Sequence, residues 1–409
     1  MIKNHIVKKH LIKREFNYMK KERLSLDFIL LLLFLAPVAF AQTKITRDTP
    51  LSDDITPVIM KIGNQKQLLM DNYIVADTWN LERYLNKPKK HPNNPIIVFD
   101  RQWEDYNIQG KRSGGPAAGT ILFDEESKLF KHWYGVSRVL NYQKPYLYTY
   151  WTCYATSKDG INWEKPNLGV VEFNGSKENN IVYKGRFWAS GRVVKDIREK
   201  DPQKRYKFFH SDVYGIPPQK DIRAEDEGKT WTIQEMIDNW VDATCLAFSP
   251  DGINWKPYEG NPVEVVGLAD GQGDAFWDAR LKKYISSRRP LVKAGPTIRR
   301  IAISYSDDLI HWTFPETVII PDELDTIELY DLTIFPYENI YFGFLAMFDS
   351  DKKQNIVQQL VFSRDLKNWD RLPTKENFIG LGKRTDFDAG MVSPARPLVV
   401  GDEIYIYYT

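Results

Sequence analysis

Short runs of aromatic, aliphatic and β-branched residues recur along this chain, and each run ends in a similar polar turn. The runs cover residues 148–155, 244–248, 301–305 and 357–362. Residues of these types favour β-strands. No long helical period appears after residue 60. The pattern therefore predicts an all-β fold.

The polar turn is a repeated motif of Ser, Asp and Trp. Its four copies read Ser-Lys-Asp-Gly-Ile-Asn-Trp at 157–163, Ser-Pro-Asp-Gly-Ile-Asn-Trp at 249–255, Ser-Asp-Asp-Leu-Ile-His-Trp at 306–312 and Ser-Arg-Asp-Leu-Lys-Asn-Trp at 363–369. A Ser or Asp side chain accepts hydrogen bonds from backbone amides two or three residues on, which closes a turn, and the Trp ring can then cover the sheet. We interpret the motif as architecture.

The spacing of the motif indicates the type of β fold. The last three copies start 57 residues apart, and a period near fifty residues built from strands is typical of a β-propeller. Residues 65–409 hold five phased units, so we expect a five-bladed propeller whose fifth blade, starting at Met391, is incomplete at its C-terminal side. We expect residues 67–86 to supply strands that join the ring. The longer spacing between the first two copies indicates an excursion at 210–242, either a lid or a solvated loop.

The first 41 residues differ from the rest. A basic stretch precedes an apolar run at 28–40 that ends in Ala39-Phe40-Ala41. This pattern predicts a signal peptide, cleaved near Ala41, and a linker at 42–64; an uncleaved anchor is the alternative. We therefore expect a secreted or periplasmic protein without stable membrane insertion after cleavage.

Charge and cysteine content limit the partners and the chemistry. Removal of residues 1–41 deletes eight basic and three acidic residues, leaving 48 Lys and Arg against 51 Asp and Glu. Such a balance gives no basic patch for nucleic acid. Cys153 and Cys245 each lie four residues before the Ser of their turn, so they occupy equivalent positions of neighbouring blades. Buried free thiols fit this placement better than a disulfide.

Carboxylates recur in phase with the turns. Asp274, Asp331 and Asp388 each follow the Trp of the preceding turn by 19 residues, and Asp270 and Glu328 lie close by. Equivalent positions of successive inner strands face one axis, so the acids are expected to gather on one side of the ring. The first two blades carry no acid in the corresponding stretches, 113–117 and 188–191.

These motifs resemble a known family. The turns, together with segments 270–278, 328–338 and 387–391, are similar to five-bladed propeller glycoside hydrolases of families 32 and 43, and to secreted bacterial proteins with a family 32 N-terminal-like domain. The resemblance covers about residues 65–409. It implies a glycosidase that holds three carboxyl groups at the rim of a funnel and needs no cofactor. One carboxyl would protonate the leaving oxygen, and an ionised one would attack or activate water.

The match departs from the family pattern in one respect. The known families place Asp on the first two blades and Glu on the third, whereas this chain has Ser113-Gly-Gly-Pro and Ala189-Ser-Gly there. Either the acids have moved to the third, fourth and fifth blades, or the chain keeps only a sugar site. The predicted function is a secreted glycoside hydrolase acting on an oligo- or polysaccharide; the alternative is a non-catalytic carbohydrate-binding propeller. A six-bladed sialidase-like enzyme is disfavoured by the five phased units.

The predicted site follows from the register and the resemblance. The expected catalytic residues are Asp270, Glu328 and Asp388. The expected substrate-binding residues are Asp274, Asp331, Arg112, Trp188 and Tyr330. For Asp274 and Asp331 the alternative is pairing with Arg or with backbone amides. The histidines show no metal-ligand spacing, so no metal site is predicted, and the arginine pairs at 288–289 and 299–300 are interpreted as solvated hairpin faces.

Overall fold

The computed structural model describes residues 62–409, with gaps at 65, 76, 105–106, 109–110, 113–116, 142–146, 186–190, 216–239, 266–268, 271–274, 291–298, 324, 326–327, 350–354 and 373. In several strand segments beside these gaps only the backbone is described. The predicted signal peptide, most of the linker and most of the excursion at 210–242 lie outside this part of the chain. Residues 62–409 form one compact unit.

Four antiparallel sheets make up most of this unit. The first holds β3 (Ala117–Asp124), β4 (Leu129–Asn141), β5 (Leu147–Ser157), β6 (Trp163–Glu164) and β7 (Ile181–Gly185). The second holds β8 (Gly191–Lys195), β9 (Tyr206–Gly215), β10 (Trp240–Ser249), β11 (Lys256–Pro257) and β12 (Glu264–Val265). The third holds β13 (Ala269–Asp270), β14 (Ala275–Asp278), β15 (Lys283–Pro290), β16 (Ile301–Ser306) and β17 (Glu316–Ile319). The fourth holds β18 (Glu328–Tyr337), β19 (Ile340–Asp349), β20 (Asn355–Ser363) and β21 (Trp369–Arg371).

Smaller elements complete the description. The pairs β1 (Asn107–Ile108) with β2 (Lys111–Arg112) and β22 (Leu398–Val400) with β23 (Glu403–Tyr405) form two-stranded sheets. The described helices are single 3-10 turns, η1 (Gln102–Glu104) and η2 (Pro202–Lys204). No helix in the described part of the chain is long and apolar enough to cross a membrane.

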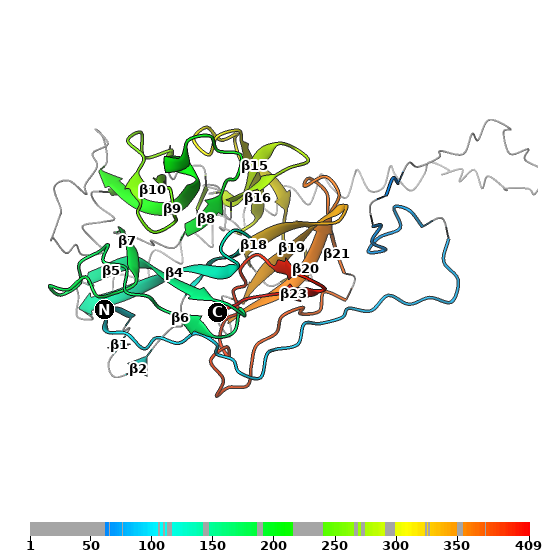
Figure 1. The fold of residues 1–409 in the computed structure, drawn as a ribbon. Coiled ribbons are helices and arrows are strands. Elements are labelled where there is room, and N and C mark those ends of the chain that lie inside the picture. The colour runs from blue at the N-terminus through cyan, green and yellow to red at the C-terminus, as the bar shows by residue number, and fades with distance from the viewer. Residues whose placement is uncertain are drawn as a thin grey trace, which may run out of the picture. The chain divides into compact units, whose positions relative to one another are not determined.

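The sheets follow one another in a propeller arrangement (Figure 1). β3 contacts β8, β8 contacts β14, and β15 and β16 contact β18, while β22 returns to β3. The all-β prediction is thus confirmed, with four complete blades instead of five. In the fifth position the described residues form only the two-stranded sheet of β22 and β23, and no third strand among them pairs with β23.

The turn motif is built as its sequence predicted. In the second sheet, Ser249 Oγ accepts hydrogen bonds from the backbone N–H groups of Asp251 (3.2 Å) and Gly252 (2.9 Å). Asp251 Oδ1 accepts from two further backbone N–H groups at 2.8 Å. The other three copies repeat these bonds. Cys153 and Cys245 are both buried as thiols, as expected.

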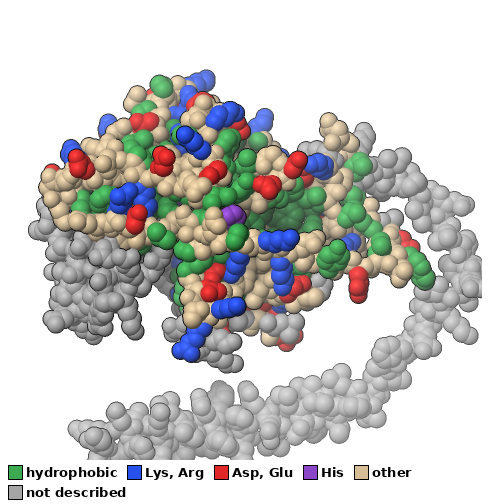
Figure 2. Space-filling model, turned by 60° about the horizontal axis from the view of Figure 1, so that its bottom comes forward, with side chains coloured by type: hydrophobic (Ala, Val, Ile, Leu, Met, Phe, Trp, Pro, Cys, Tyr) green, Lys and Arg blue, Asp and Glu red, His purple; other side chains and the backbone are tan. Residues whose placement is uncertain are grey.

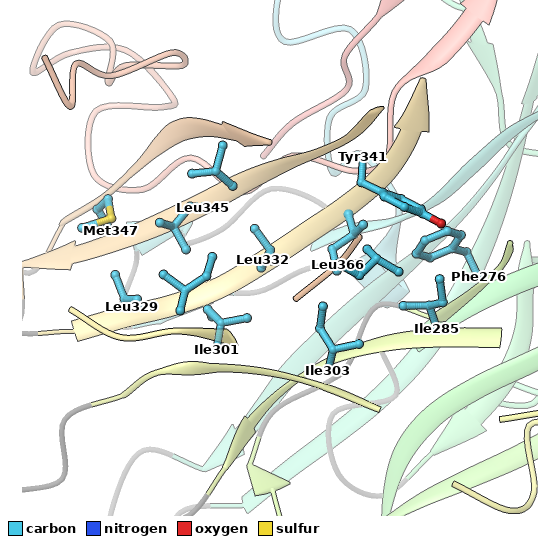
Figure 3. Packing of buried hydrophobic residues seen from close by; sticks show 13 residues of the cluster. Phe276, Ile285, Ile301, Ile303, Leu329, Leu332, Tyr341, Leu345, Met347 and Leu366 are labelled. Atoms are coloured by element: carbon cyan, nitrogen blue, oxygen red, sulfur yellow. The ribbon is translucent and has the colours of Figure 1, made fainter. Parts of the chain in front are cut away.

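The largest described cluster of buried apolar side chains lies between the third and fourth sheets (Figure 3). Ile285, Ile301 and Ile303 of the third sheet meet Leu329, Leu332 and other residues of the fourth. Alternate residues of a strand face opposite sides of its sheet, and Ile301 and Ile303 of β16, like Leu345 and Met347 of β19, accordingly enter this core two residues apart. Leu329 and Leu332 are fully buried and hold the first strand of the fourth sheet in place.

Residues 66–104, called here the N-terminal strap, pass from the fourth sheet to the first without forming a described strand (Figure 1). The prediction that residues 67–86 supply ring strands is therefore wrong for the described residues. Leu68 and Met70 pack against the fourth sheet, and Ile97 and Phe99 pack against the first. The strap covers the sheets by its side chains instead of by backbone pairing.

Candidate functional site

The fourth sheet begins with a predicted site residue and an irregularity. Glu328 is the first residue of β18 and lies opposite Phe348 of β19. The register shifts between Leu329, opposite Met347, and Asp331, opposite Ala346, which leaves Tyr330 in a bulge. A β-bulge turns side chains away from the regular alternation and is frequent next to active sites.

Two arginines surround Glu328 and Tyr330. The guanidinium of Arg299 forms an ion pair with Glu328, whose side chain is 13% exposed. The same guanidinium lies 5.5 Å from the centre of the Tyr330 ring, and that of Arg289 lies 4.5 Å from it. Phe348 meets Tyr330 edge-on, with ring centres 5.3 Å apart. One carboxylate, two guanidinium groups and one phenol therefore gather at the start of β18.

The third sheet brings a second predicted acid to this edge. Asp270 of β13 lies opposite Arg289 of β15 in the strand register, and β15 contacts β18. Arg289 also lies over Tyr330, and Arg299 lies near the same ring and pairs with Glu328. The backbone position of Asp270 and the side chain of Glu328 are thus connected through two arginines and one tyrosine. Only the backbone of Asp270 is described, so its carboxylate is not placed.

Asp388 lies in a different set of contacts. Its side chain is 3% exposed and its Oδ2 atom accepts hydrogen bonds from Lys90 Nζ (2.5 Å) and from the Tyr408 hydroxyl (3.0 Å). Burial, followed by the bond to Asp388, raises the pKa of Tyr408, so the phenol stays protonated. The described partners of Asp388 are thus the N-terminal strap and the end of the chain, whereas those of Glu328 are on the third and fourth sheets.

The remaining predicted residues are placed in part. Asp331 Oδ1 accepts a hydrogen bond from the backbone N–H of Leu332 at 2.8 Å, which is one of the two roles considered for it. Arg112 is in β2, where only the backbone is described, and Asp274 and Trp188 lie outside the described residues. Their assignment to substrate binding stays a prediction.

The arginine pairs are the part of this site that the sequence interpretation missed. Arg288 is 4% exposed, and its guanidinium lies 5.1 Å from the ring centres of Phe209 and Trp312. Arg289 and Arg299 contact Tyr330 as described above. The interpretation as a solvated hairpin face is therefore wrong for Arg288, whereas the side chain of Arg299 is 35% exposed. The available signal was the position of Arg288 and Arg289 inside the strand-forming run at 283–290, where a charged side chain next to aromatic residues often stacks on a ring.

No group of three or more acidic, His or Cys side chains arranged to hold a metal ion occurs among the residues with described side chains.

Comparison with known proteins shows structural likeness at low identity. No family model matches the chain. A β-fructofuranosidase from Schwanniomyces occidentalis, complexed with fructosyl-erythritol, is similar at 17% identity and a TM-score of 0.42, over 67% of this chain and 50% of that one. A thermostable family-43 glycoside hydrolase is similar at 14% identity and 0.44, over 68% of this chain and 83% of that one. An N-acetylgalactosamine deacetylase from F. plautii, in complex with blood group B trisaccharide, is similar at 12% identity and a TM-score of 0.42, over 75% of this chain and 84% of that one.

A family 32 β-fructofuranosidase from Bombyx mori is also similar, at 14% identity and a TM-score of 0.39, over 60% of this chain and 46% of that one. Glycoside hydrolases of families 32 and 43 are thus among the similar structures, as the sequence motifs predicted. The chain spans about half the length of the fructofuranosidase that it matches. At this level of identity and superposition, the likeness does not extend to the reaction.

Proposed function

We propose that this protein is an exported glycoside hydrolase that cleaves a glycosidic bond in an oligo- or polysaccharide. The observation that carries the proposal is the gathering of Glu328, Tyr330, Arg289 and Arg299 beside the backbone of Asp270, where the third and fourth sheets meet. Glycosidases need two carboxyl groups on opposite sides of the scissile bond. In this proposal Asp270, the last residue of β13, and Glu328, the first residue of β18, are the two carboxyl groups.

Each group has a chemical role in this proposal. Glu328, ion-paired with Arg299, is suited to act as the ionised carboxylate that attacks the sugar or activates water. Asp270 would then protonate the leaving oxygen. Tyr330, next to Arg289, Arg299 and Phe348, would contact the sugar through its ring. The arginines favour a substrate with acidic or strongly polar substituents.

The test is a screen of the purified full chain against aryl glycosides and plant or algal polysaccharides, with release of reducing ends as the readout. Glu328→Gln and Asp270→Asn should each lower turnover by about 1,000-fold or more while leaving the fold intact, because each removes a transition-state interaction. Glu338→Gln is the matched control: it lies just beyond the far end of β18, and its carboxylate pairs with Lys66. Turnover that survives Glu328→Gln would exclude this site.

A second candidate function is non-catalytic carbohydrate binding. Both predicted catalytic acids with described side chains are already engaged in ion pairs, Glu328 with Arg299 and Asp388 with Lys90, which suits a fixed binding surface as well as a reaction. Calorimetric titration with the polysaccharides of the screen separates the two. A binding protein would retain affinity in Glu328→Gln, lose it in Tyr330→Ala, and release no reducing ends.

Export rests on the basic stretch and apolar run of the first 41 residues, which end in an A-x-A sequence. N-terminal sequencing of material secreted by an expressing host should begin near Gln42. Material that still begins at Met1 or Met19 would contradict cleavage.

A further inference from the structure

Arg299 of the third sheet contacts three consecutive residues at the start of β18. Its guanidinium forms the ion pair with Glu328, and its backbone C=O accepts a hydrogen bond from the N–H of Leu329 at 3.2 Å. The guanidinium also lies 5.5 Å from the centre of the Tyr330 ring and 6.0 Å from that of Phe348, which is opposite Glu328 in β19. One residue of the third blade thus holds the first three residues of the fourth.

These contacts coincide with the β-bulge at the start of β18. The register against β19 shifts between Leu329 and Asp331, and a bulge disrupts the hydrogen-bond ladder locally and re-aims the neighbouring side chains. Pairing with β19 therefore fixes the direction of the Glu328 carboxylate less firmly than it would in a regular strand. Arg299 supplies a second set of contacts at this point, from the neighbouring blade.

An ion pair alone does not set Arg299 apart. On the face displayed in Figure 2, basic and acidic side chains are interspersed, and exposed pairs of this kind contribute little. The Glu328 side chain, however, is only 13% exposed, and its partner is tied to β18 by a backbone bond as well. A guanidinium offers its donors in a rigid planar fork and stacks on rings, whereas an ammonium is a point charge on a flexible stem. The arrangement uses properties of Arg that Lys lacks.

Given the glycosidase function proposed above, on which this inference rests, we propose that Arg299 is a positioning residue that fixes the direction of the Glu328 carboxylate for cleavage of the glycosidic bond. A displacement of about 1 Å in a reacting group can lower a rate about 100-fold. The direction of Glu328 therefore sets turnover, while affinity for the sugar comes from other contacts. Loss of Arg299 lowers kcat and leaves KM nearly unchanged, as expected for an interaction that matters in the transition state.

The test measures kcat and KM of two variants with the aryl glycoside or polysaccharide that the wild-type chain hydrolyses fastest. Arg299→Lys keeps the charge but not the planar fork, so kcat should fall about 10-fold or more. Arg299→Ala should lower kcat about 100-fold or more. Guanidinium chloride at millimolar concentration should restore part of the kcat of Arg299→Ala, because the free cation can take the place of the side chain. Sodium chloride at the same ionic strength should not.

Arg280→Lys is the matched control. Arg280 also pairs with a carboxylate, that of Asp278 at 3.2 Å, and its guanidinium lies 3.8 Å from the centre of the Tyr341 ring. Its side chain is 35% exposed, as is that of Arg299. Tyr341 is near the start of β19, whereas Glu328 lies opposite a residue near its end. Arg280→Lys should change the melting temperature about as much as Arg299→Lys does and leave kcat unchanged.

The outcomes separate the role of Arg299 from the function of the site. If Glu328→Gln is inactive but the folded Arg299 variants turn over as Arg280→Lys does, the positioning role is overturned and the proposed function stands. A raised KM at unchanged kcat would place Arg299 in sugar binding and would also overturn it, as would a loss of turnover that follows the melting temperature and is not rescued by guanidinium. Absence of any turnover, or turnover that survives Glu328→Gln, would contradict the function proposed for the site and, with it, the role of Arg299.

Discussion

The hydroxyl of Tyr284 donates a 2.5 Å hydrogen bond to the carboxylate of Asp196 and so joins the third sheet to the second. Lys207 completes the group, with its Nζ 2.8 Å from Asp196 Oδ2 and 3.1 Å from the Tyr284 hydroxyl. Tyr206 bonds similarly to Asp124, at 3.4 Å, between the second sheet and the first. In each case the tyrosine is near the start of the second strand of its sheet (β15 or β9). The aspartate is at or just after the end of the first strand of the preceding sheet (β8 or β3). Buried polar contacts therefore join successive blades in addition to apolar packing.

The substitution Asp196→Ala should destabilise the propeller by about 3–5 kcal/mol. It removes one partner of a buried ion pair and leaves Lys207, 8% exposed, without its closest carboxylate. Denaturant unfolding measures the change. Asp307→Ala is the control: Asp307 pairs with Lys283 at the surface, where its side chain is 76% exposed, and its loss should cost less than about 1 kcal/mol. Equal effects of the two variants would contradict the structural role of Asp196.

His132 should make the native state less stable as the pH falls. Burial lowers the pKa of its imidazole to about 3, whereas the unfolded chain binds a proton near pH 6.5. Between these values only the unfolded state takes up the proton, so stability declines on acidification from about pH 6.5 toward 3.

The size of this effect is measurable with one variant. The imidazole should lower the free energy of unfolding by about 2 kcal/mol at pH 5 relative to pH 7. The variant His132→Phe cannot titrate at this position, so its free energy of unfolding should fall by about 2 kcal/mol less than that of the wild type between the two pH values. Unfolding curves at both pH values give the comparison. An unchanged pH dependence in His132→Phe would show that the ring is protonated in the folded protein.

The strap is held to the first sheet by Glu104. This carboxylate is fully buried; it accepts hydrogen bonds from Lys165 Nζ (2.7 Å) and from the backbone N–H groups of Asp100 and Arg101 (3.1 Å each). Glu104→Ala should therefore cost about 3–5 kcal/mol and expose the strap to limited proteolysis. Glu125→Ala, at a surface pair with Lys128, is the control and should leave both stability and cleavage pattern unchanged. Cleavage within residues 87–104 at the wild-type rate in Glu104→Ala would contradict the role of Glu104.

The predicted catalytic role of Asp388 is separable from a structural one. If it is catalytic, Asp388→Asn should lower turnover by several orders of magnitude with a modest loss of stability. If its role is to hold Lys90 and Tyr408, the variant should lower the melting temperature and leave turnover of the folded protein unchanged. Asp386→Asn, an exposed residue of the same turn, controls for nonspecific effects.

Local features of the fold were predictable because they depend on residues that are close together in the sequence. The turn motif was recognised since Ser249 and Asp251 bond to their own neighbouring backbone. The strap was not, because its contacts join residues far apart in the chain: Arg364 with Asp71 and Lys90 with Asp388 are separated by 293 and 298 positions. Residues 67–86 contain apolar residues that pack against the sheets through their side chains and form no described strand. An apolar pattern in the sequence is the same whether a segment pairs by its backbone or only packs by its side chains.

Only part of the candidate site was predictable from the sequence. The register of the repeat led to Glu328 because the period places equivalent residues at equivalent strand starts. It did not lead to Arg299, which is 29 residues earlier in the chain and meets the start of β18 through its side chain and through a backbone hydrogen bond from Leu329. From sequence alone, two adjacent arginines in a hairpin are interpreted as solvent-exposed. The contact of Arg289 with the ring of Tyr330 becomes visible only in the structure.

The path of the strap sets the order in which the ring can be completed. Each of the four complete sheets forms from residues close in sequence, so it can assemble early and largely on its own. Lys90 and Asp388 are 298 residues apart in the chain, and bringing such distant segments together carries the entropy cost of closing a very long loop. We therefore expect the strap to dock late in folding, and a chain shortened before residue 104 to retain the sheets while leaving the gap between the last and the first open.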